Sequence, residues 1–174
     1  MKMLTVFALL CVGMALTGAA AVPEEEKETT QDQVEESVLF KRSSCSGRWS
    51  EFNGRCFRFS PKRMTWAKAE RRCLSMGGNL ASVHSTEEYH AIQHLIMTTS
   101  YDYREAWIGG SDAQQEGFWL WTDGSPFSYV NWCPGEPNNL GRYQHCLQMN
   151  FGGGKCWDDL SCGEHRPFAC AKNI

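Results

Sequence analysis

Hydrophobic and polar positions divide the chain into three stretches of different character. Positions 4–16 are nearly all apolar, positions 23–42 are dominated by acidic and other polar side chains, and from position 43 onward apolar residues recur at short intervals. Only the third pattern is typical of a chain that buries one face of each element in a core. We therefore expect one folded domain over 43–174, because a single core commonly serves roughly 100–200 residues.

The first half of this domain carries helical patterns. Apolar residues at helical spacing predict a helix that begins near Thr65 and ends at Gly77-Gly78. A second helix is expected to begin at Ser85, because Ser85 and Glu88 have the spacing of a capping box. The expected buried stripes are Trp66, Ala69, Cys73 and Leu74 in the first helix and Tyr89, Ile92 and Ile96 in the second.

Strand patterns come before and after the two helices. Residues 55–60 alternate as a short strand does, with Phe57 and Phe59 on one face. From Ala106 onward, short apolar runs alternate with turns rich in Gly, Pro and Asn, and a long loop covers 132–144. This order predicts an α+β domain with two early helices and a second half rich in strands and loops.

The first 22 residues have the pattern of a secretory signal peptide. Lys2 gives a positive start, residues 4–16 are apolar, and residues 18–21 are the small residues that signal peptidase requires. The alternative is an uncleaved signal anchor, because the apolar stretch approaches the ~20 residues that span a bilayer. We interpret 1–22 as a cleaved signal and expect a secreted, extracellular protein with no membrane insertion after its removal.

Residues 23–42 form an acidic segment with seven acidic and three basic residues. They show no helical or strand period, so they are not expected to fold alone. The segment ends in Lys41-Arg42, which indicates either a propeptide removed after Arg42 or an ordinary linker.

Charge and cysteine content narrow the class of the domain. Residues 43–174 hold 13 basic and 13 acidic residues, so their net charge gives no reason to expect nucleic acid as a partner. No run of Lys or Arg marks a membrane-surface patch. The chain has nine cysteines, of which Cys11 would leave with the signal, and the remaining even number favours disulfides in an exported domain.

Signatures of catalysis are missing from the sequence, so we do not expect an enzyme. There is no Gly-x-Ser-x-Gly elbow, no glycine-rich phosphate loop between strand and helix, and no His-Glu-x-x-His. His90 and His94 are four residues apart on the second helix, but no third ligand is near in sequence. We interpret the two histidines as part of a solvated helix face rather than a zinc site.

Oxygen donors gather in the long loop and shortly after it. Glu136 and Asn138 lie in its Pro/Gly-rich part, Gln144 ends it, and Asp158 and Asp159 follow Trp157. Carboxylate and amide oxygens are the ligands that Ca²⁺ selects, about six to eight at a time, and a loop can fold around so large an ion. The alternative is a polar surface turn.

Several motifs in the same order resemble the C-type lectin-like domain over essentially all of 43–174. They are Trp107-Ile108-Gly109-Gly110, Glu136-Pro137-Asn138, Cys156-Trp157-Asp158-Asp159 and the order of the cysteines. The chain resembles secreted fish lectins of the ladderlectin and nattectin types and related type II antifreeze proteins. The resemblance implies a disulfide-stapled α+β fold with two helices, short antiparallel sheets and a long calcium-binding loop.

The resemblance also implies how most cysteines pair. By the family pattern Cys45 pairs with Cys56, Cys73 with Cys170, and Cys146 with Cys162. Cys133 and Cys156 are left over. They form either a fourth bridge, which would tie the long loop to the segment with the two aspartates, or an intermolecular bond.

The family's principal calcium site corresponds to Glu136, Asn138, Gln144, Asp158 and Asp159. Gln144 stands where the family usually has Glu, and Asp158 stands where it usually has Asn, so the two departures leave the ligand charge unchanged. In the family, each bound sugar hydroxyl meets one carboxylate and one amide besides the ion. Glu136/Asn138 and Gln144/Asp158 supply these two pairs, with donor and acceptor exchanged in the second.

Two further features follow from the resemblance. A cis peptide is expected before Pro137, because cis bonds are essentially confined to X-Pro. For an auxiliary calcium site, Asp112 and Glu116 match the family's first two acids, whereas Asn139 and His145 stand where further carboxylates are usual.

These features imply a secreted, calcium-dependent lectin without catalysis. The Glu-Pro-Asn triplet goes with mannose-, glucose- or fucose-type glycans, here on microbial surfaces or glycoproteins, in innate immune recognition. A single shallow site binds weakly, so a homo-oligomer would raise avidity. The alternatives are an ice-binding protein of the type II antifreeze kind and a calcium-independent member that binds protein.

Overall fold

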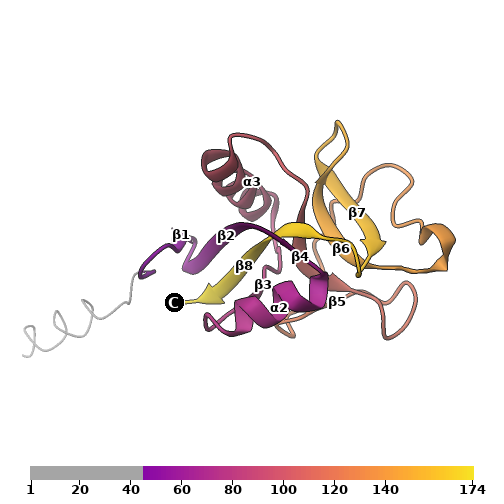
Figure 1. The fold of residues 1–174 in the computed structure, drawn as a ribbon, viewed down its shortest axis with the longest axis horizontal. Coiled ribbons are helices and arrows are strands. Elements are labelled where there is room, and N and C mark those ends of the chain that lie inside the picture. Colours follow the sequence, from indigo (N-terminus) through magenta and orange to yellow (C-terminus); the bar gives the residue numbers. More distant parts are fainter. Residues whose placement is uncertain (1–44) are drawn as a thin grey trace, which may run out of the picture. The chain divides into compact units, whose positions relative to one another are not determined.

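Helix α2 (Trp66–Leu74) and helix α3 (Thr86–Ser100) pack against a sheet of eight strands (Figure 1). The computed structural model describes residues 45–174, so the expected signal peptide (1–22) and acidic segment (23–42) lie outside the described residues. Within the described part of the chain, neither helix has the length and apolar character needed to cross a bilayer. The α+β class and the two early helices predicted from the sequence are confirmed.

The strands form one connected sheet rather than separate ones. Its order is β1-β2-β8-β4-β6-β7, with β3 beside β8 and β5 beside β4. The pairings of these strands are antiparallel except between β4 and β8, which run parallel and meet at Trp107 and Phe168. This short parallel contact joins what were expected to be separate antiparallel sheets. The strands are β1 Ser50–Phe52, β2 Arg55–Met64, β3 Asn79–Leu80, β4 Ala106–Ser111, β5 Leu120–Trp121, β6 Gln144–Phe151, β7 Cys156–Ser161 and β8 Arg166–Asn173.

Helix α3 begins as predicted but its capping box is only half formed. The Ser85 hydroxyl accepts a hydrogen bond from the Glu88 backbone N–H at 3.2 Å. The Glu88 carboxylate does not return to Ser85. It instead accepts from Arg55 of β2 at 2.9 Å and from the His84 backbone N–H at 2.8 Å. A long-range ion pair therefore replaces the local bond, and it ties α3 to β2.

The predicted apolar faces are correct except at Leu74, and Trp66 is half-buried against the core. Tyr89, Ile92 and Ile96 are buried, as are Ala69 and Cys73 of α2. Leu74, which was expected in the buried stripe of α2, is 55% exposed. The prediction was wrong there because residue 74 is one step of about 100° around the helix from Cys73, which carries it off the buried face.

Two predicted strands differ in length from those observed. The strand expected over 55–60 continues to Met64, because β2 resumes its pairing with β8 at Met64 and Arg166 beyond an irregularity. Residues 118–121 are one of the short apolar runs from which strands were expected after Ala106, and they form only the two-residue β5. Long stretches of the second half therefore lie outside regular strands, as the density of turn residues predicts.

Four disulfides hold the described domain together. They are Cys45–Cys56, Cys73–Cys170, Cys133–Cys156 and Cys146–Cys162. Three of them are the pairings that the family resemblance implies, and the pair left open, Cys133 and Cys156, forms the fourth bridge within the chain. Cys73–Cys170 links α2 to β8 across 97 residues of sequence, whereas Cys133–Cys156 links the long loop to β7.

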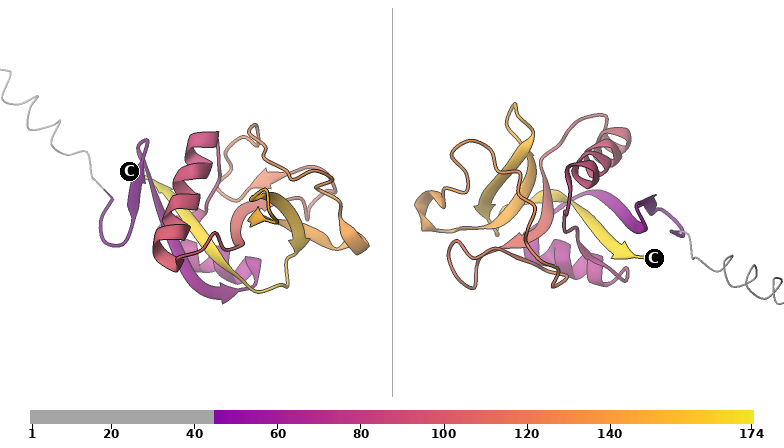
Figure 2. Two further views of the ribbon diagram at one scale, coloured as in Figure 1. Left: turned by 90° about the horizontal axis from the view of Figure 1, so that it is seen from above. Right: turned by 180° about the vertical axis from the view of Figure 1, so that it is seen from behind.

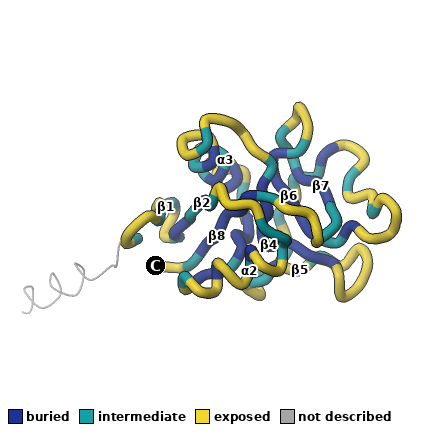
Figure 3. The backbone as a smooth tube through the Cα atoms, in the orientation of Figure 1, coloured by how far each residue is buried: buried dark blue, intermediate teal, exposed yellow. Residues whose placement is uncertain are grey.

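The buried stretches of the chain lie along the strands and on the inner sides of the helices (Figure 3). The core that they form is rich in aromatic side chains. Strand β4 is buried along its whole length, and Gly109 and Gly110 permit its neighbours to approach. A Cβ on Gly109 would lie 2.5 Å from the Leu80 carbonyl oxygen, and one on Gly110 would lie 2.7 Å from Leu147 Cδ1. The two glycines of the Trp-Ile-Gly-Gly motif are therefore required by packing.

We predict that Gly109→Ala lowers the free energy of unfolding by about 1–3 kcal/mol, because the new methyl group overlaps backbone that cannot easily shift. Gly153→Ala is the matched control, since a Cβ there meets nothing within 4 Å. Urea denaturation of both variants measures the difference. Equal stability of the two variants would contradict the packing argument.

Candidate metal centre

Strand β7 carries two aspartates directly after a core tryptophan. Trp157 is fully buried, and its indole packs edge to face against Trp121 and Trp132. Asp158 and Asp159 follow it and are also buried, opposite Gln148 and Leu147 of β6. The apolar burial of Trp157 therefore determines where the two carboxylates lie.

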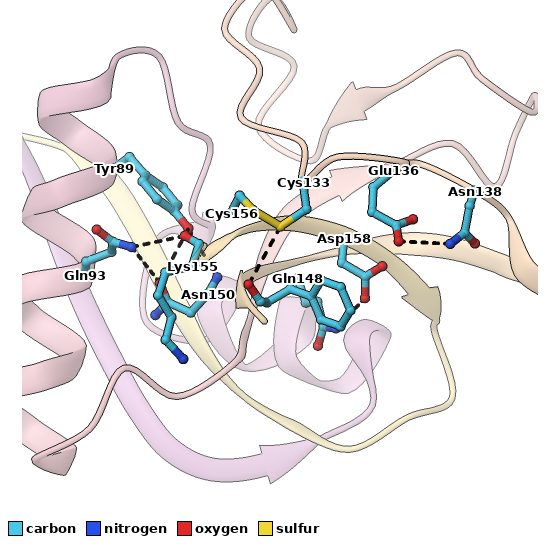
Figure 4. The surroundings of a disulfide bond; sticks show 11 residues. Tyr89, Gln93, Cys133, Glu136, Asn138, Gln148, Asn150, Lys155, Cys156 and Asp158 are labelled. Atoms are coloured by element: carbon cyan, nitrogen blue, oxygen red, sulfur yellow. Dashed lines mark hydrogen bonds between the residues drawn. A yellow bond between two sulfur atoms is a disulfide. The ribbon is translucent and has the colours of Figure 1, made fainter. Parts of the chain in front are cut away.

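Backbone hydrogen bonds hold the start of the long loop against β7. The Cys133 N–H donates to the Trp157 carbonyl at 2.9 Å, and the Trp157 N–H donates to the Asn131 carbonyl at 2.8 Å. The Cys133–Cys156 disulfide covalently links the same two segments. Figure 4 shows Glu136, which comes after Cys133 in the loop, lying near Asp158. The loop thus brings Glu136 back to the strand that carries the aspartates.

Helix α3 supports the turn that precedes β7. The Tyr89 hydroxyl donates to the Lys155 carbonyl, and the Gln93 side-chain amide donates to Asn150 Oδ1 at 2.9 Å (Figure 4). Burial raises the pKa of Tyr89 to about 12, so the phenol remains a donor at neutral pH. The turn is therefore connected to the helix by neutral hydrogen bonds.

Three carboxylates meet at the junction of the loop and β7. One oxygen from each of Glu136, Asp158 and Asp159 lies within 4.8 Å of the others. Glu136 Oε2 is buried and has no hydrogen-bond partner. A buried oxygen without a donor is costly, so the geometry fits a cation that would bind this atom and balance the three charges.

The same crowding perturbs the acidity of the site. Burial, together with the charges of Asp158 and Asp159, raises the pKa of Glu136 to about 7. Burial also raises the pKa of Asp158, and the nearby Asp159 adds to that shift, although a hydrogen bond from Gln148 opposes it. Without a cation the site therefore favours bound protons.

Asn138 and Gln144 complete a hydrogen-bonded network with these acids. Asn138 Nδ2 donates to Glu136 Oε1 at 2.9 Å, and the Asp159 carboxylate accepts from the Asn138 backbone N–H at 2.9 Å. The Leu140 N–H donates to Asn138 Oδ1 at 2.8 Å and to Gln144 Oε1 at 2.5 Å. The structure therefore brings all five predicted ligands together, and the Glu136-Pro137 bond is cis.

Sequence reasoning missed two residues that position Asp158. Gln148 is 1% exposed, and its amide donates to Asp158 Oδ2 at 2.6 Å. Arg166 Nε in turn donates to Gln148 Oε1 at 2.9 Å, which orients the amide. A glutamine within the apolar run of β6 was a signal for Gln148, but Arg166 comes from β8 and only the fold brings it near.

A second cluster contains the four residues compared with the auxiliary site. His145 Nδ1 lies 3.0 Å from Asp112 Oδ1 and 3.6 Å from Glu116 Oε2, and Asn139 hydrogen bonds to Glu116. The chain folds these residues together, but an imidazole and an amide occupy positions where the family usually has carboxylates. The cluster therefore carries fewer negative charges than that pattern supplies.

The remaining candidates fall outside the metal centre. His90 and His94 are exposed on α3, and in the described part of the chain neither belongs to a cluster of three metal-ligating side chains. Trp132 is half-buried and packs against the core. Tyr143, next to Gln144, is 59% exposed, and its ring lies over Gly141, where a Cβ would be 2.1 Å from the ring.

We predict that the metal-free protein becomes less stable as pH rises from about 5 to about 8. The pKa of Glu136 is about 7 in the folded state against an ordinary value of 4.5, so in this range the folded state binds more protons than the unfolded state, and stability falls with pH. Glu136→Gln should flatten this profile, whereas the exposed Glu51→Gln should retain it. Thermal unfolding in chelator measures the profiles. A flat wild-type profile would be inconsistent with this assignment.

Comparison with known proteins assigns the chain to a family. The family model described as Lectin C-type domain matches residues 62–172. Ladderlectin of Oncorhynchus mykiss is 39% identical over 174 residues, covering 96% of this chain and 92% of that protein. The galactose-specific lectin nattectin of Thalassophryne nattereri is 45% identical over 132 residues, covering 76% of this chain and 82% of that protein.

A solved structure gives the same assignment for the fold. The crystal structure of a calcium-independent type II antifreeze protein matches with a TM-score of 0.68 and 40% identity, covering 75% of this chain and 95% of that chain. The matched family model covers more than half of this chain and includes every residue of the candidate metal centre. The chain therefore belongs to the C-type lectin domain family.

Proposed function

We propose that the protein is a secreted, calcium-dependent lectin that binds glycans through the long loop and the two aspartates of β7, without catalysis. The observation that carries the proposal is the buried, unpartnered Glu136 Oε2 among three converging carboxylates. Family membership supports glycan binding, and the four disulfides support an extracellular location.

The donor set favours calcium over other common metals. Glu136, Asp158 and Asp159 supply carboxylate oxygens, and Asn138 and Gln144 supply amide oxygens. These are hard ligands on a loop and a strand, which suits the large and variable coordination shell of Ca²⁺, whereas Zn²⁺ prefers nitrogen and sulfur. When bound, the ion would supply coordination positions for two neighbouring hydroxyls of a sugar.

The protein's own residues would orient the sugar and fix the site. Gln148 holds Asp158 through Oδ2, which leaves Oδ1 available for the ion or for a sugar hydroxyl. Asn138 and Glu136 already hydrogen bond to each other, so a hydroxyl placed between them would accept from the amide and donate to the carboxylate. The Cys133–Cys156 bridge keeps loop and strand in register, which limits the ordering that binding requires.

Two observations favour different sugars. The Glu136-Pro137-Asn138 triplet supports mannose-, glucose- or fucose-type sugars, whereas the similar nattectin is named galactose-specific. We favour the first class because Glu136 and Asn138 stand in the family's order for it. Tyr143 offers an exposed ring at the loop for packing on a sugar face. Weak single-site binding suits the repeated glycans of microbial surfaces and a role in innate immune recognition.

We predict that Asp159→Asn weakens calcium binding on the order of 100-fold, because it removes one of three ligand charges and disturbs the bonds to the Asn138 and Asn139 backbone. Asp102→Asn, an exposed acid outside the site, is the control. Isothermal titration with CaCl₂ measures both variants. If the wild-type protein gives no heat and no calcium-dependent thermal shift, the proposal is wrong.

We predict binding to mannose-, glucose- or fucose-terminated glycans on an array in calcium, and its loss in chelator. Glu136→Gln/Asn138→Asp reverses the donor and acceptor of the triplet at constant charge, so it should shift preference toward galactose. Titration with calcium confirms that the variant still binds the ion. A wild-type preference for galactose would refute the assignment of the sugar class while leaving calcium-dependent lectin activity intact.

Ice binding is the second candidate function, because a type II antifreeze structure is among the similar proteins. The loop carries Arg142 and Tyr143 exposed at its tip, and a charged, uneven surface does not match flat ice. We therefore expect no thermal hysteresis from the purified protein. Measurable hysteresis together with an empty glycan array would establish the alternative.

A further inference from the structure

Five basic side chains surround one hollow on the outer side of α2. Lys62 and Arg63 come from the end of β2, and Lys68, Arg71 and Arg72 come from α2 itself. The hollow has a volume of about 490 Å³, and its remaining lining residues are Met64, Ser75 and His165. We call it the basic hollow.

Helical geometry places the cations of α2 together. Residues 68, 71, 72 and 75 lie on one face at 100° per residue, opposite the buried Ala69 and Cys73. All five basic side chains are exposed, and Figure 3 shows the exposed stretches along α2. Helix α2 packs against β3, β4 and β8, whereas Figure 1 and Figure 2 show the long loop of the candidate metal centre extending from the other end of the sheet. The basic hollow is therefore separate from the candidate metal centre.

The charges of the basic hollow are not balanced by neighbouring acids. No acidic residue lines it, and within residues 45–174 none of the five cations belongs to an ion pair. Glu70, the acid of α2, is engaged elsewhere, since its carboxylate accepts from Asn79 at 2.7 Å and from the Leu80 N–H at 2.6 Å. Mutual repulsion of five cations gives this surface a positive field that a polyanion would relieve.

We propose that the basic hollow is a second, calcium-independent binding site, and that its ligand is a sulfated polysaccharide. Sulfate groups suit several Lys and Arg at the rim. The half-buried Met64 and the aliphatic stems of the basic residues provide an apolar floor for sugar rings.

The lining residues distinguish this ligand from other polyanions. The hollow contains none of the exposed large hydrophobic side chains that would insert into a bilayer; Leu74 is not among its lining residues. It also lacks Phe, Tyr and Trp on which unpaired bases would stack. A chain of sugars carrying several sulfates meets both conditions.

Surface plasmon resonance with immobilised sulfated dextran tests the proposal in the presence of chelator. The protein is taken as secreted by cells that express the full chain. Arg71→Gln/Arg72→Gln removes two rim charges with little change in helix propensity. Arg48→Gln/Arg104→Gln is the matched control, with the same chemistry and net charge change at exposed sites outside the hollow.

The wild-type protein is expected to bind sulfated dextran but not unsulfated dextran, with affinity that falls as salt rises. The Arg71/Arg72 variant should bind about tenfold more weakly and the Arg48/Arg104 variant within about twofold of wild type. The proposal would be overturned if the wild-type protein did not bind, if it bound only when calcium replaced the chelator, or if both variants were weakened equally. Binding to phosphatidylserine vesicles without binding to sulfated dextran would overturn it in favour of a membrane. Each outcome is independent of calcium-dependent lectin activity.

Discussion

Trp157 joins the aromatic core to the candidate metal centre. Its indole packs edge to face on Trp121, Trp132, Tyr129 and Tyr89, with ring centroids 5.6–6.3 Å apart. Each such pair contributes about 0.5–1.5 kcal/mol beyond the burial of its area. The next two residues are Asp158 and Asp159, and Trp157 also bonds through its backbone to Asn131 and Cys133. Moving this ring would displace both the strand with the aspartates and the start of the loop.

This arrangement explains how the domain tolerates an unfavourable cluster of charges. Glu136, Asp158 and Asp159 repel one another, and their burial adds a desolvation cost. The aromatic core and the Cys133–Cys156 bridge hold the acids in place despite this repulsion. Unfavourable interactions that the rest of the fold offsets are typical of functional sites. A bound cation would remove the repulsion between these acids and so stabilise the folded domain.

Charge is distributed unevenly over a domain that is formally neutral. From residue 43 onward acids and bases are equal in number, yet three acids converge at the loop and five bases surround α2. Each cluster has its own electrostatic field, because charges on separate parts of the surface are screened from each other by solvent and salt. The net charge of the domain therefore gives no reason to expect an anionic partner, whereas the local positive field around α2 does.

The sequence by itself determined the α+β class, the two helices and the family. Periodic apolar residues and short motifs carry that information, because they act within one element or one loop. Ser85 and the stripe through Tyr89, Ile92 and Ile96 are local signals of this kind, and they were read correctly. The carboxylate of Glu88 was predicted to bond locally, but Arg55, a neighbour across the fold rather than along the chain, decides where it lies. The prediction for Leu74 was wrong for a local reason, its angle around the helix from Cys73.

The candidate ligands show the same division. Residue types and the family motifs pointed to Glu136, Asn138, Gln144, Asp158 and Asp159. The positions of Gln148 and Arg166 behind Asp158, and the meeting of Lys62 and Arg63 with the cations of α2, depend on which strands and helices become neighbours. Only the tertiary structure decided these, because side-chain contacts and electrostatic fields depend on distance in space, and residues far apart in sequence become close only when the core forms.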